Sequence, residues 1–208
     1  MILLGQYDSP FVRRVGIALS LYQIPFEHRP WSVWGNAEDI AHFNPLRRVP
    51  TLVLDDETVL VDSFAILDAI DEMVPPERAL LPRHGLVRRD GLRIAALCAG
   101  FADKAVSLLY ESLFRTHPSE AWMARCRLQI QDCLVRLEAE RAARPTPHWL
   151  GPALSHADIA FACSLRFVHE AHPALVDVEQ LPRLAEHAAR CEALPQFRAA
   201  YQPLENNL

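Results

Sequence analysis

The sequence predicts two domains, an α/β domain over residues 1–78 and an all-helical domain over 87–208, joined by a linker at 79–86. Three observations support this division. Strand and helix patterns alternate up to residue 78, β patterns disappear from about residue 87, and the segment between them is rich in proline and charge. A chain of 208 residues is long enough for two small domains.

The chain opens with a predicted βαβ unit. Ile2-Leu3-Leu4 is a short apolar run typical of a buried strand. Ser9 then caps a helix whose apolar residues recur at helical spacing as far as Tyr22, and Pro25 ends it. Residues 26–29 form the next strand, which runs parallel to the first because a helix connects the two.

A ββα unit follows, after a short helical turn in residues 36–43. Residues 51–54 and 59–61 flank an acidic turn, which predicts an antiparallel hairpin. Ser63 begins the next helix and Pro75-Pro76 stops it. The order βαβ-ββα predicts a thioredoxin-like domain with a four-stranded mixed sheet and helices on both faces.

The rest of the chain is predicted to be a helical bundle. The second helix of the bundle has an apolar stripe that begins at Trp122, and the third begins at Ser155. Ser155 and Asp158 have the spacing of a capping box, and a last helix runs from Leu181-Pro182 to about residue 194. The apolar stripe of the first helix consists of Leu92, Ala95, Ala96, Ala99, Ala102 and Val106.

Composition excludes several classes of function. Apolar residues make up 50% of the chain and charged residues 23%, which is ordinary for a globular protein with a real core. The formal charge of -5 disfavours a nucleic-acid partner, which needs clustered basic residues. No run reaches the roughly 18 apolar residues of a membrane span, and the first residues lack the basic segment of a signal peptide. We therefore expect a cytoplasmic protein without a membrane partner.

The cysteines and histidines indicate neither disulfides nor metal. The five cysteines lie in helical patterns without a Cys-x-x-Cys pair, which favours reduced core residues. His169 and His172 are three residues apart, but Pro173 follows at once and the pattern is not that of a zinc-binding helix. We expect no metal and no bound cofactor.

Ser9 is the first candidate functional residue. Its hydroxyl lies where a helix presents unpaired N–H groups and the positive end of its dipole, which stabilise an anion such as a thiolate. A plain helix cap is the simpler alternative. In a thioredoxin-like domain, however, Ser9 occupies the position of the reactive cysteine and Val12 that of its partner. Disulfide reduction is therefore disfavoured, and the hydroxyl is suited to bind the thiol of another molecule.

Two further segments complete a candidate peptide site. Val49-Pro50 precedes the third strand, and a cis bond there would leave the Val49 backbone free to pair with an extended peptide, although statistics alone favour trans. Ser63 and the helical N–H groups suit a carboxylate, and Asp62 suits an ammonium, unless the two are only a capping pair. Arg48 suits a second carboxylate. Together these groups fit a small thiol peptide with a zwitterionic end, which is glutathione.

Four segments of the chain resemble the glutathione transferases of the bacterial and plant serine type. They are Ser9-Pro10-Phe11-Val12-Arg13-Arg14-Val15, Asn44-Pro45-Leu46-Arg47-Arg48-Val49-Pro50, Val61-Asp62-Ser63 with Ala65-Ile66-Leu67, and Ser155-His156-Ala157-Asp158-Ile159. The resemblance implies that Ser9 activates the thiol and that Val49 pairs with the cysteinyl backbone. It also implies that Asp62 and Ser63 hold the γ-glutamyl end, that glutathione is a co-substrate, and that the protein is a homodimer.

Two positions depart from that family. Arg47 stands where the family frequently has glycine, which predicts a narrower entrance to the site. Phe64 stands where the family often has arginine, so the usual subunit contact there is in doubt unless the aromatic ring replaces it.

The expected function is transfer of glutathione, as a thiolate, to a small apolar electrophile, as in detoxification. Phe11 and the loop around Trp34 are candidate walls for the electrophile, and so are Phe101, Ala105 and Leu108 of the helical domain. Core packing is the alternative for those helical residues.

Three alternatives stay open. In the first alternative, the chain is a non-catalytic relative that binds a ligand or serves as a scaffold. In the second, it is an enzyme that uses glutathione for isomerisation, peroxide reduction or reductive dehalogenation. Tyr7 competes with Ser9, since other transferase classes use a tyrosine near the end of the first strand.

Overall fold

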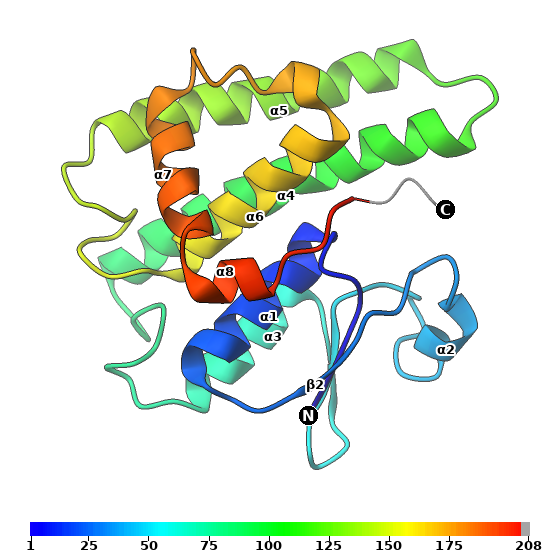
Figure 1. Cartoon of the computed structure of the whole chain (residues 1–208), viewed down its shortest axis with the longest axis vertical. Coiled ribbons are helices and arrows are strands. Elements are labelled where there is room, and N and C mark those ends of the chain that lie inside the picture. Colours follow the sequence, from blue (N-terminus) through cyan, green and yellow to red (C-terminus); the bar gives the residue numbers. More distant parts are fainter. Residues whose placement is uncertain (205–208) are drawn as a thin grey trace. The chain divides into compact units, whose positions relative to one another are not determined.

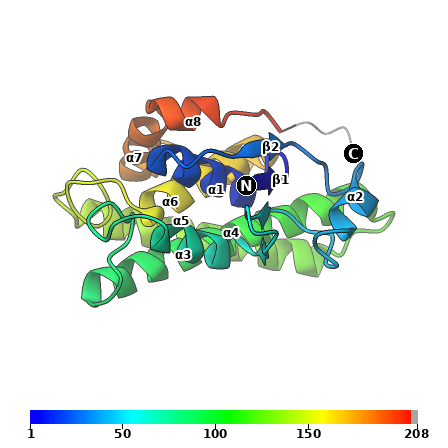
Figure 2. The same ribbon diagram turned by 90° about the horizontal axis from the view of Figure 1, so that it is seen from below.

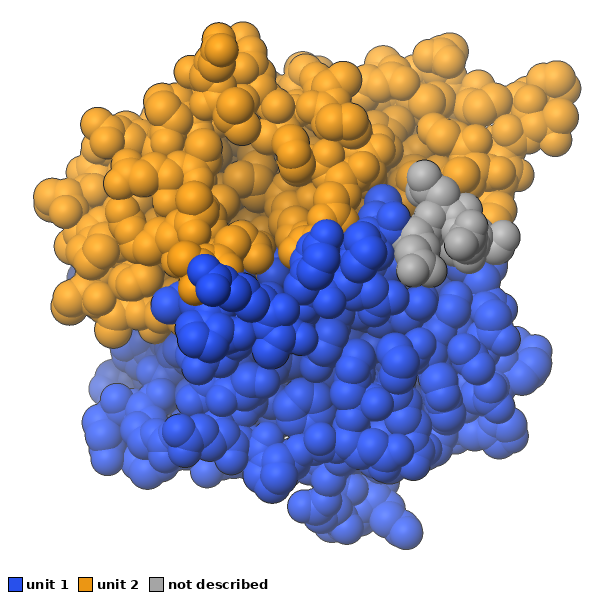
Figure 3. Space-filling model, viewed as in Figure 1, with its two compact units in different colours: residues 1–88, 194–208 blue, residues 89–193 orange. Residues whose placement is uncertain are grey.

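The computed structural model describes residues 1–204, and the chain divides into two compact units (Figure 3). The first unit comprises Met1–Arg88 together with residues 194–204, and the second comprises Arg89–Ala193. The predicted helical domain ran from 87 to 208. The two divisions therefore differ after residue 193, where the chain returns to the first unit.

The first unit contains the four-stranded mixed sheet that the sequence predicts. Its strands are β1 (Ile2–Leu4), β2 (Glu27–Arg29), β3 (Thr51–Val53) and β4 (Val59–Val61). Their order across the sheet is β2-β1-β3-β4, with β1 parallel to β2 and antiparallel to β3, and β3 antiparallel to β4. This topology confirms the thioredoxin-like fold.

The strand register defines one edge of the sheet that matters for function. Arg29, Leu4, Thr51 and Val61 lie side by side in one row across the four strands. The strands β1, β2 and β4 end at this row, and the antiparallel β3 begins there. The segments that follow β1, precede β3 and follow β4 therefore leave the sheet at the same end, which we call the site edge.

Two helices of the first unit pack side by side against the sheet (Figure 1). They are α1 and α3, and their buried apolar side chains join those of β1 and β3 in one core that includes Leu3, Val15, Leu52 and Ile66. The helices of this unit are α1 (Pro10–Tyr22), α2 (Ala37–Ala41), α3 (Ser63–Glu72) and the short α8 (Pro195–Ala199).

The helix α8 belongs to the first unit and lies beside α1 (Figure 2). A buried arginine of α1 holds it there. Arg13 is 2% exposed, and its guanidinium donates to the carbonyl oxygens of Phe197 and Ala200, both at 2.9 Å. A buried guanidinium needs such acceptors, and the last carbonyls of a helix have none inside the helix. The pairing satisfies both groups. Phe197 is buried as expected of the tail, whereas Tyr201 is 54% exposed.

The second unit is built from helices, as predicted. They are α4 (Leu86–Phe114, whose first three residues fall in the first unit), α5 (Glu120–Ala142), α6 (His156–Ala171), the 3-10 turn η1 (Pro173–Leu175) and α7 (Pro182–Glu192). An ion pair of 2.6 Å between Arg93 and Glu140 links α4 to α5, and α7 packs against both α5 and α6. No helix among residues 1–204 is both long enough and apolar enough to cross a membrane.

The buried face of α4 is rotated from the predicted stripe. Ile94, Cys98 and Phe101 are buried, whereas Leu92 and Ala96 are exposed. The first half of α4 has small or apolar residues around most of its circumference, so spacing alone does not determine which face packs. None of the five cysteines, all within the described residues, forms a disulfide, and four of them are buried while Cys133 is partly exposed.

Candidate functional site

The site edge brings together the first-domain segments predicted to bind the thiol peptide. Ser9 follows β1, Val49-Pro50 precedes β3, and Asp62 and Ser63 follow β4. They share this end of the sheet because β1 and β4 both run antiparallel to β3. Their chemical roles stay predictions.

Gly5 allows two of these segments to approach each other. Its backbone φ is +126°, and a Cβ there would lie 2.5 Å from Val12 Cγ2 and 2.8 Å from Val49 Cβ. Any side chain at Gly5 would therefore push the start of α1 away from the loop before β3. Gly5 was not among the site residues predicted from the sequence, although a glycine directly after an apolar strand was the available signal.

Ser9 is the N-cap of α1. Its Oγ accepts a hydrogen bond from the Val12 N–H at 3.4 Å, and Pro10 occupies the first helical position. Because the hydroxyl oxygen accepts, its proton remains to donate. The positive end of the helix dipole acts at the same point. A thiolate placed there would be stabilised by both.

The side chain of Tyr7 packs beside α1, next to Gly16 and away from the N-terminus of the helix where Ser9 lies. Its ring stacks on His28 at 4.0 Å between centroids, and a Cβ on Gly16 would lie 2.7 Å from its hydroxyl oxygen. Gly16 comes seven residues after Ser9, which corresponds to about 10 Å along a helix. Burial raises the pKa of Tyr7 to about 12. The position and the raised pKa both favour a packing role for this phenol.

The loop before β3 presents a peptide backbone at the site edge. The Val49-Pro50 bond is cis. Asn44, 2% exposed, donates to the Arg48 carbonyl at 2.9 Å and to Thr51 Oγ1 at 3.1 Å, which holds the loop against β3. Within residues 1–204, neither the N–H nor the C=O of Val49 makes a hydrogen bond. Both groups are therefore suited to pair with an extended peptide.

Asp62 and Ser63 begin α3 in an unusual conformation. Asp62 has φ +70°, and its carboxylate accepts from the Phe64 N–H at 2.7 Å. For a residue other than glycine, such backbone costs about 1–3 kcal/mol and is concentrated at functional sites. The exposed carboxylate keeps its second oxygen for another donor.

A buried arginine sets the orientation of Ser63. Ser63 is 3% exposed, and its Oγ accepts from Arg14 Nη2 at 2.5 Å. The accepting oxygen leaves the Ser63 proton to donate towards a carboxylate. No role for Arg14 was predicted from the sequence, because an arginine on a helix is usually exposed.

The two departures from the family pattern have local explanations. Arg47 has φ +52°, in the left-handed region that glycine enters without cost, and its guanidinium pairs with Glu38 of α2. The Phe64 ring is covered by the Arg14 guanidinium, whose carbon lies 4.2 Å from the ring centroid. Arg47 thus adopts a left-handed backbone conformation that glycine adopts without cost. Phe64 forms a cation–π contact with an arginine of its own unit.

The candidate electrophile residues fall into two groups. In the first unit, Phe11 is half-buried and Trp34 is 47% exposed. In the second unit, Phe101, Ala105 and Leu108 are all at most 3% exposed on the buried face of α4. Their part in binding an electrophile stays a prediction.

The fold and the site edge together define a thioredoxin-like protein with a serine at the N-cap of its first helix. Family models described as the glutathione S-transferase N-terminal domain and C-terminal domain match residues 8–73 and 120–190. The chain belongs to the glutathione S-transferase family.

Three similar proteins illustrate this membership. An uncharacterized GST-like protein of Escherichia coli, YibF, is 32% identical over 90% of this chain and 93% of its own length. A probable maleylacetoacetate isomerase of Vibrio cholerae is 29% identical over 96% of this chain and 94% of its own. A glutathione S-transferase of Methylobacillus flagellatus, crystallised with glutathione bound, has a TM-score of 0.89 at 26% identity and covers 98% and 99% of the two chains.

Proposed function

We propose that this protein binds glutathione at the site edge and activates its thiol as a thiolate through Ser9. The Val49 backbone pairs with the cysteinyl part, Asp62 and Ser63 hold the γ-glutamyl end, and Arg48 meets the glycyl carboxylate. The activated sulfur attacks a small apolar electrophile that contacts Phe11 and Trp34. Glutathione is thus a co-substrate.

One observation carries the proposal. The Ser9 hydroxyl lies at the N-terminus of α1, and Gly5 lies close to both Val12 of this helix and Val49. A peptide that paired with Val49 would therefore have its thiol near the Ser9 hydroxyl. The glutathione-bound relative with the same fold supports the choice of ligand.

Retention on glutathione-agarose followed by conjugation of a chlorinated nitroaromatic tests the proposal. We expect elution by free glutathione and steady formation of the aryl thioether. Retention without turnover of any electrophile in a panel would instead support a non-catalytic binding role. Failure to bind glutathione would refute the proposal.

Isomerisation is a second candidate, because a similar protein from Vibrio cholerae is named a probable maleylacetoacetate isomerase. The two reactions differ in the fate of the thiol. Conjugation consumes one glutathione per turnover, whereas isomerisation returns it. Titration of free thiol during turnover of maleylacetoacetate and of the chloroaromatic separates them.

Asp62→Ala is expected to raise the KM for glutathione about tenfold while kcat changes little. The reason is that the proposed contact between the Asp62 carboxylate and the γ-glutamyl ammonium is the same in the ground state and the transition state. Steady-state kinetics with varied glutathione measure the split. Asp62→Asn is the matched variant, since it retains an acceptor for the Phe64 N–H and loses only the charge. If Asn behaves like the wild type, the carboxylate serves only as a helix cap.

The homodimer implied by the family is also a proposal. At its N-terminal end α4 exposes three apolar side chains, Leu86, Val87 and Leu92, which is a surface suited to a partner. Light scattering coupled to gel filtration should give twice the 23.5 kDa mass of the chain. A monomer at micromolar concentration would contradict this prediction.

A further inference from the structure

A basic pocket in the second unit lies outside the proposed thiol chemistry. It has a volume of about 460 Å³ and is formed by the end of α5, the segment 142–147 and α7. One carboxylate, that of Glu186, lines it. The arginines that line it are Arg141, Arg144, Arg183 and Arg190. A concentration of four guanidinium groups is notable in a chain whose formal charge is -5.

Arg141 carries a buried charge without a counter-ion. It is 8% exposed, its Nη2 donates to the Thr146 carbonyl, and its Nη1 is buried without a hydrogen-bond partner among residues 1–204. No carboxylate in that range lies within ion-pair distance. The Trp149 ring, 5.7 Å from the guanidinium carbon, contributes a cation–π contact but no negative charge. Burial lowers the pKa of Arg141, against the longer-range attraction of Asp158.

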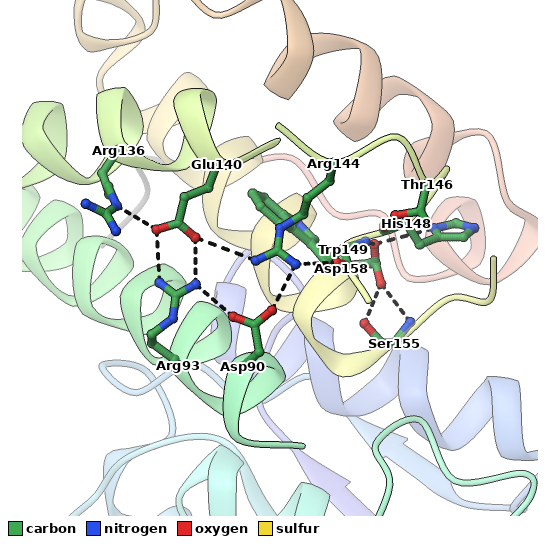
Figure 4. Close-up of polar contacts among 10 residues, drawn as sticks. All are labelled: Asp90, Arg93, Arg136, Glu140, Arg144, Thr146, His148, Trp149, Ser155 and Asp158. Carbon is green, nitrogen blue, oxygen red and sulfur yellow. Dashed lines mark hydrogen bonds and ion pairs between the residues drawn. The ribbon is translucent and has the colours of Figure 1, made fainter. Parts of the chain in front are cut away.

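The other arginines leave the pocket short of negative charge. Arg183 and Arg190 share Glu186, at 3.5 Å and 2.9 Å, so that two cations face one anion. Arg144 pairs with Asp90 at 2.8 Å and donates to the Trp149 carbonyl at 3.0 Å, within the network drawn in Figure 4. This network positions Arg144. An anion in the pocket would be attracted by Arg141, Arg183 and Arg190 together.

We infer that this pocket binds a small phosphate-bearing molecule. One planar guanidinium group can donate two parallel hydrogen bonds to two oxygens of a phosphate. A buried cation without a counter-ion is stabilised strongly when an anionic ligand binds beside it. The volume is within the range of small-ligand sites. Pro145 and Pro147 line the pocket, and their fixed φ angles make this part of its wall rigid. The site is distinct from the site edge and does not depend on glutathione.

Isothermal titration with pyrophosphate and, separately, with ADP tests the inference on the full chain at constant ionic strength. We expect saturable binding with one site per chain. The double variant Arg183→Gln, Arg190→Gln should weaken binding at least about tenfold, because it removes two charge-assisted contacts. ADP binding more tightly than pyrophosphate would identify a nucleotide ligand, and equal affinities would indicate recognition of the phosphates alone.

A matched variant and two competitors make the result decisive. Arg125→Gln removes one positive charge, as Arg141→Gln does, but from an exposed position on α5 outside the pocket, and it should change the affinity less than twofold. Arg141→Gln should weaken binding as well, with thermal melting used to verify folding because Arg141 holds Thr146. The inference is wrong if Arg125→Gln has the same effect as the double variant, if citrate binds as tightly as pyrophosphate, or if glutathione displaces pyrophosphate. Since binding is measured without glutathione, the proposed transferase function can fail independently.

Discussion

Replacing Ser9 with alanine is expected to raise the thiol pKa of bound glutathione towards its free value near 8.5 and to reduce conjugation at pH 7 by about 10- to 100-fold. The Ser9 hydroxyl stabilises the thiolate of glutathione more than the thiol, because its hydrogen bond to the charged sulfur is the stronger one. The variant loses this preference for the thiolate. The acidic limb of the kcat/KM profile should therefore move to higher pH, and activity should recover in alkali. Ultraviolet titration of the bound thiolate measures the pKa directly.

Two variants separate the hydroxyl from the other properties of this position. Ser9→Asp retains an acceptor for the Val12 N–H, so α1 stays capped, but it places a negative charge beside the sulfur. The thiol pKa should then rise at least as much as in Ser9→Ala. Tyr7→Phe should leave that pKa nearly unchanged. If instead Tyr7→Phe raised it and Ser9→Ala did not, Tyr7 would be the activating residue.

Much of the first unit follows from short-range signals in the sequence. A serine followed by proline marks the start of α1, the acidic turn marks the hairpin, and Pro75-Pro76 follows the end of α3. Once the fold is known, strand direction alone brings Ser9, Val49 and Asp62 to one end of the sheet. This part of the candidate site was therefore predictable.

Long-range contacts were not predictable in the same way. Arg13 donates hydrogen bonds to carbonyl oxygens that are 184 and 187 residues further along the sequence. Arg14 of α1 donates to Ser63 of α3. Nothing in the local pattern distinguishes these two buried arginines from exposed ones. The packing face of α4 was misassigned for a related reason, since its apolar residues surround the helix and only tertiary contacts select among them.

The second large effect is expected at Asp158, which is fully buried at the start of α6. Its carboxylate accepts from the N–H of Trp149 at 2.9 Å and from the N–H of Ser155 at 2.8 Å. The Ser155 hydroxyl donates to it at 2.5 Å, and His187 Nε2 lies 3.0 Å away. Figure 4 shows this side chain joining the capping box of α6 to the segment before it. The contact with His187 adds a link to α7.

Asp158→Ala should reduce the free energy of unfolding by about 3–5 kcal/mol, because it leaves several buried donors without an acceptor. Urea unfolding followed by circular dichroism measures the loss. Asp132→Ala is the matched control, since Asp132 is exposed on α5, and it should change stability by less than about 0.5 kcal/mol. If the two substitutions reduced the free energy of unfolding equally, the buried carboxylate of Asp158 would contribute no more to stability than an exposed one.

The pH dependence provides an independent check of the same carboxylate. Burial by itself raises the pKa of Asp158, but contacts from His148 and His187 and hydrogen bonds from Ser155 and Trp149 outweigh it and hold the pKa below its ordinary range. A folded-state pKa below the unfolded value of about 3.9 stabilises the protein fully above that value, and the contribution is lost as the pH falls towards the folded-state pKa. The stability difference between wild type and Asp158→Ala should therefore be constant above about pH 5 and should narrow between pH 4 and pH 2. A difference that stayed constant down to pH 2 would mean that Asp158 has the same pKa in the folded and unfolded states, which would contradict the lowered pKa expected from its contacts.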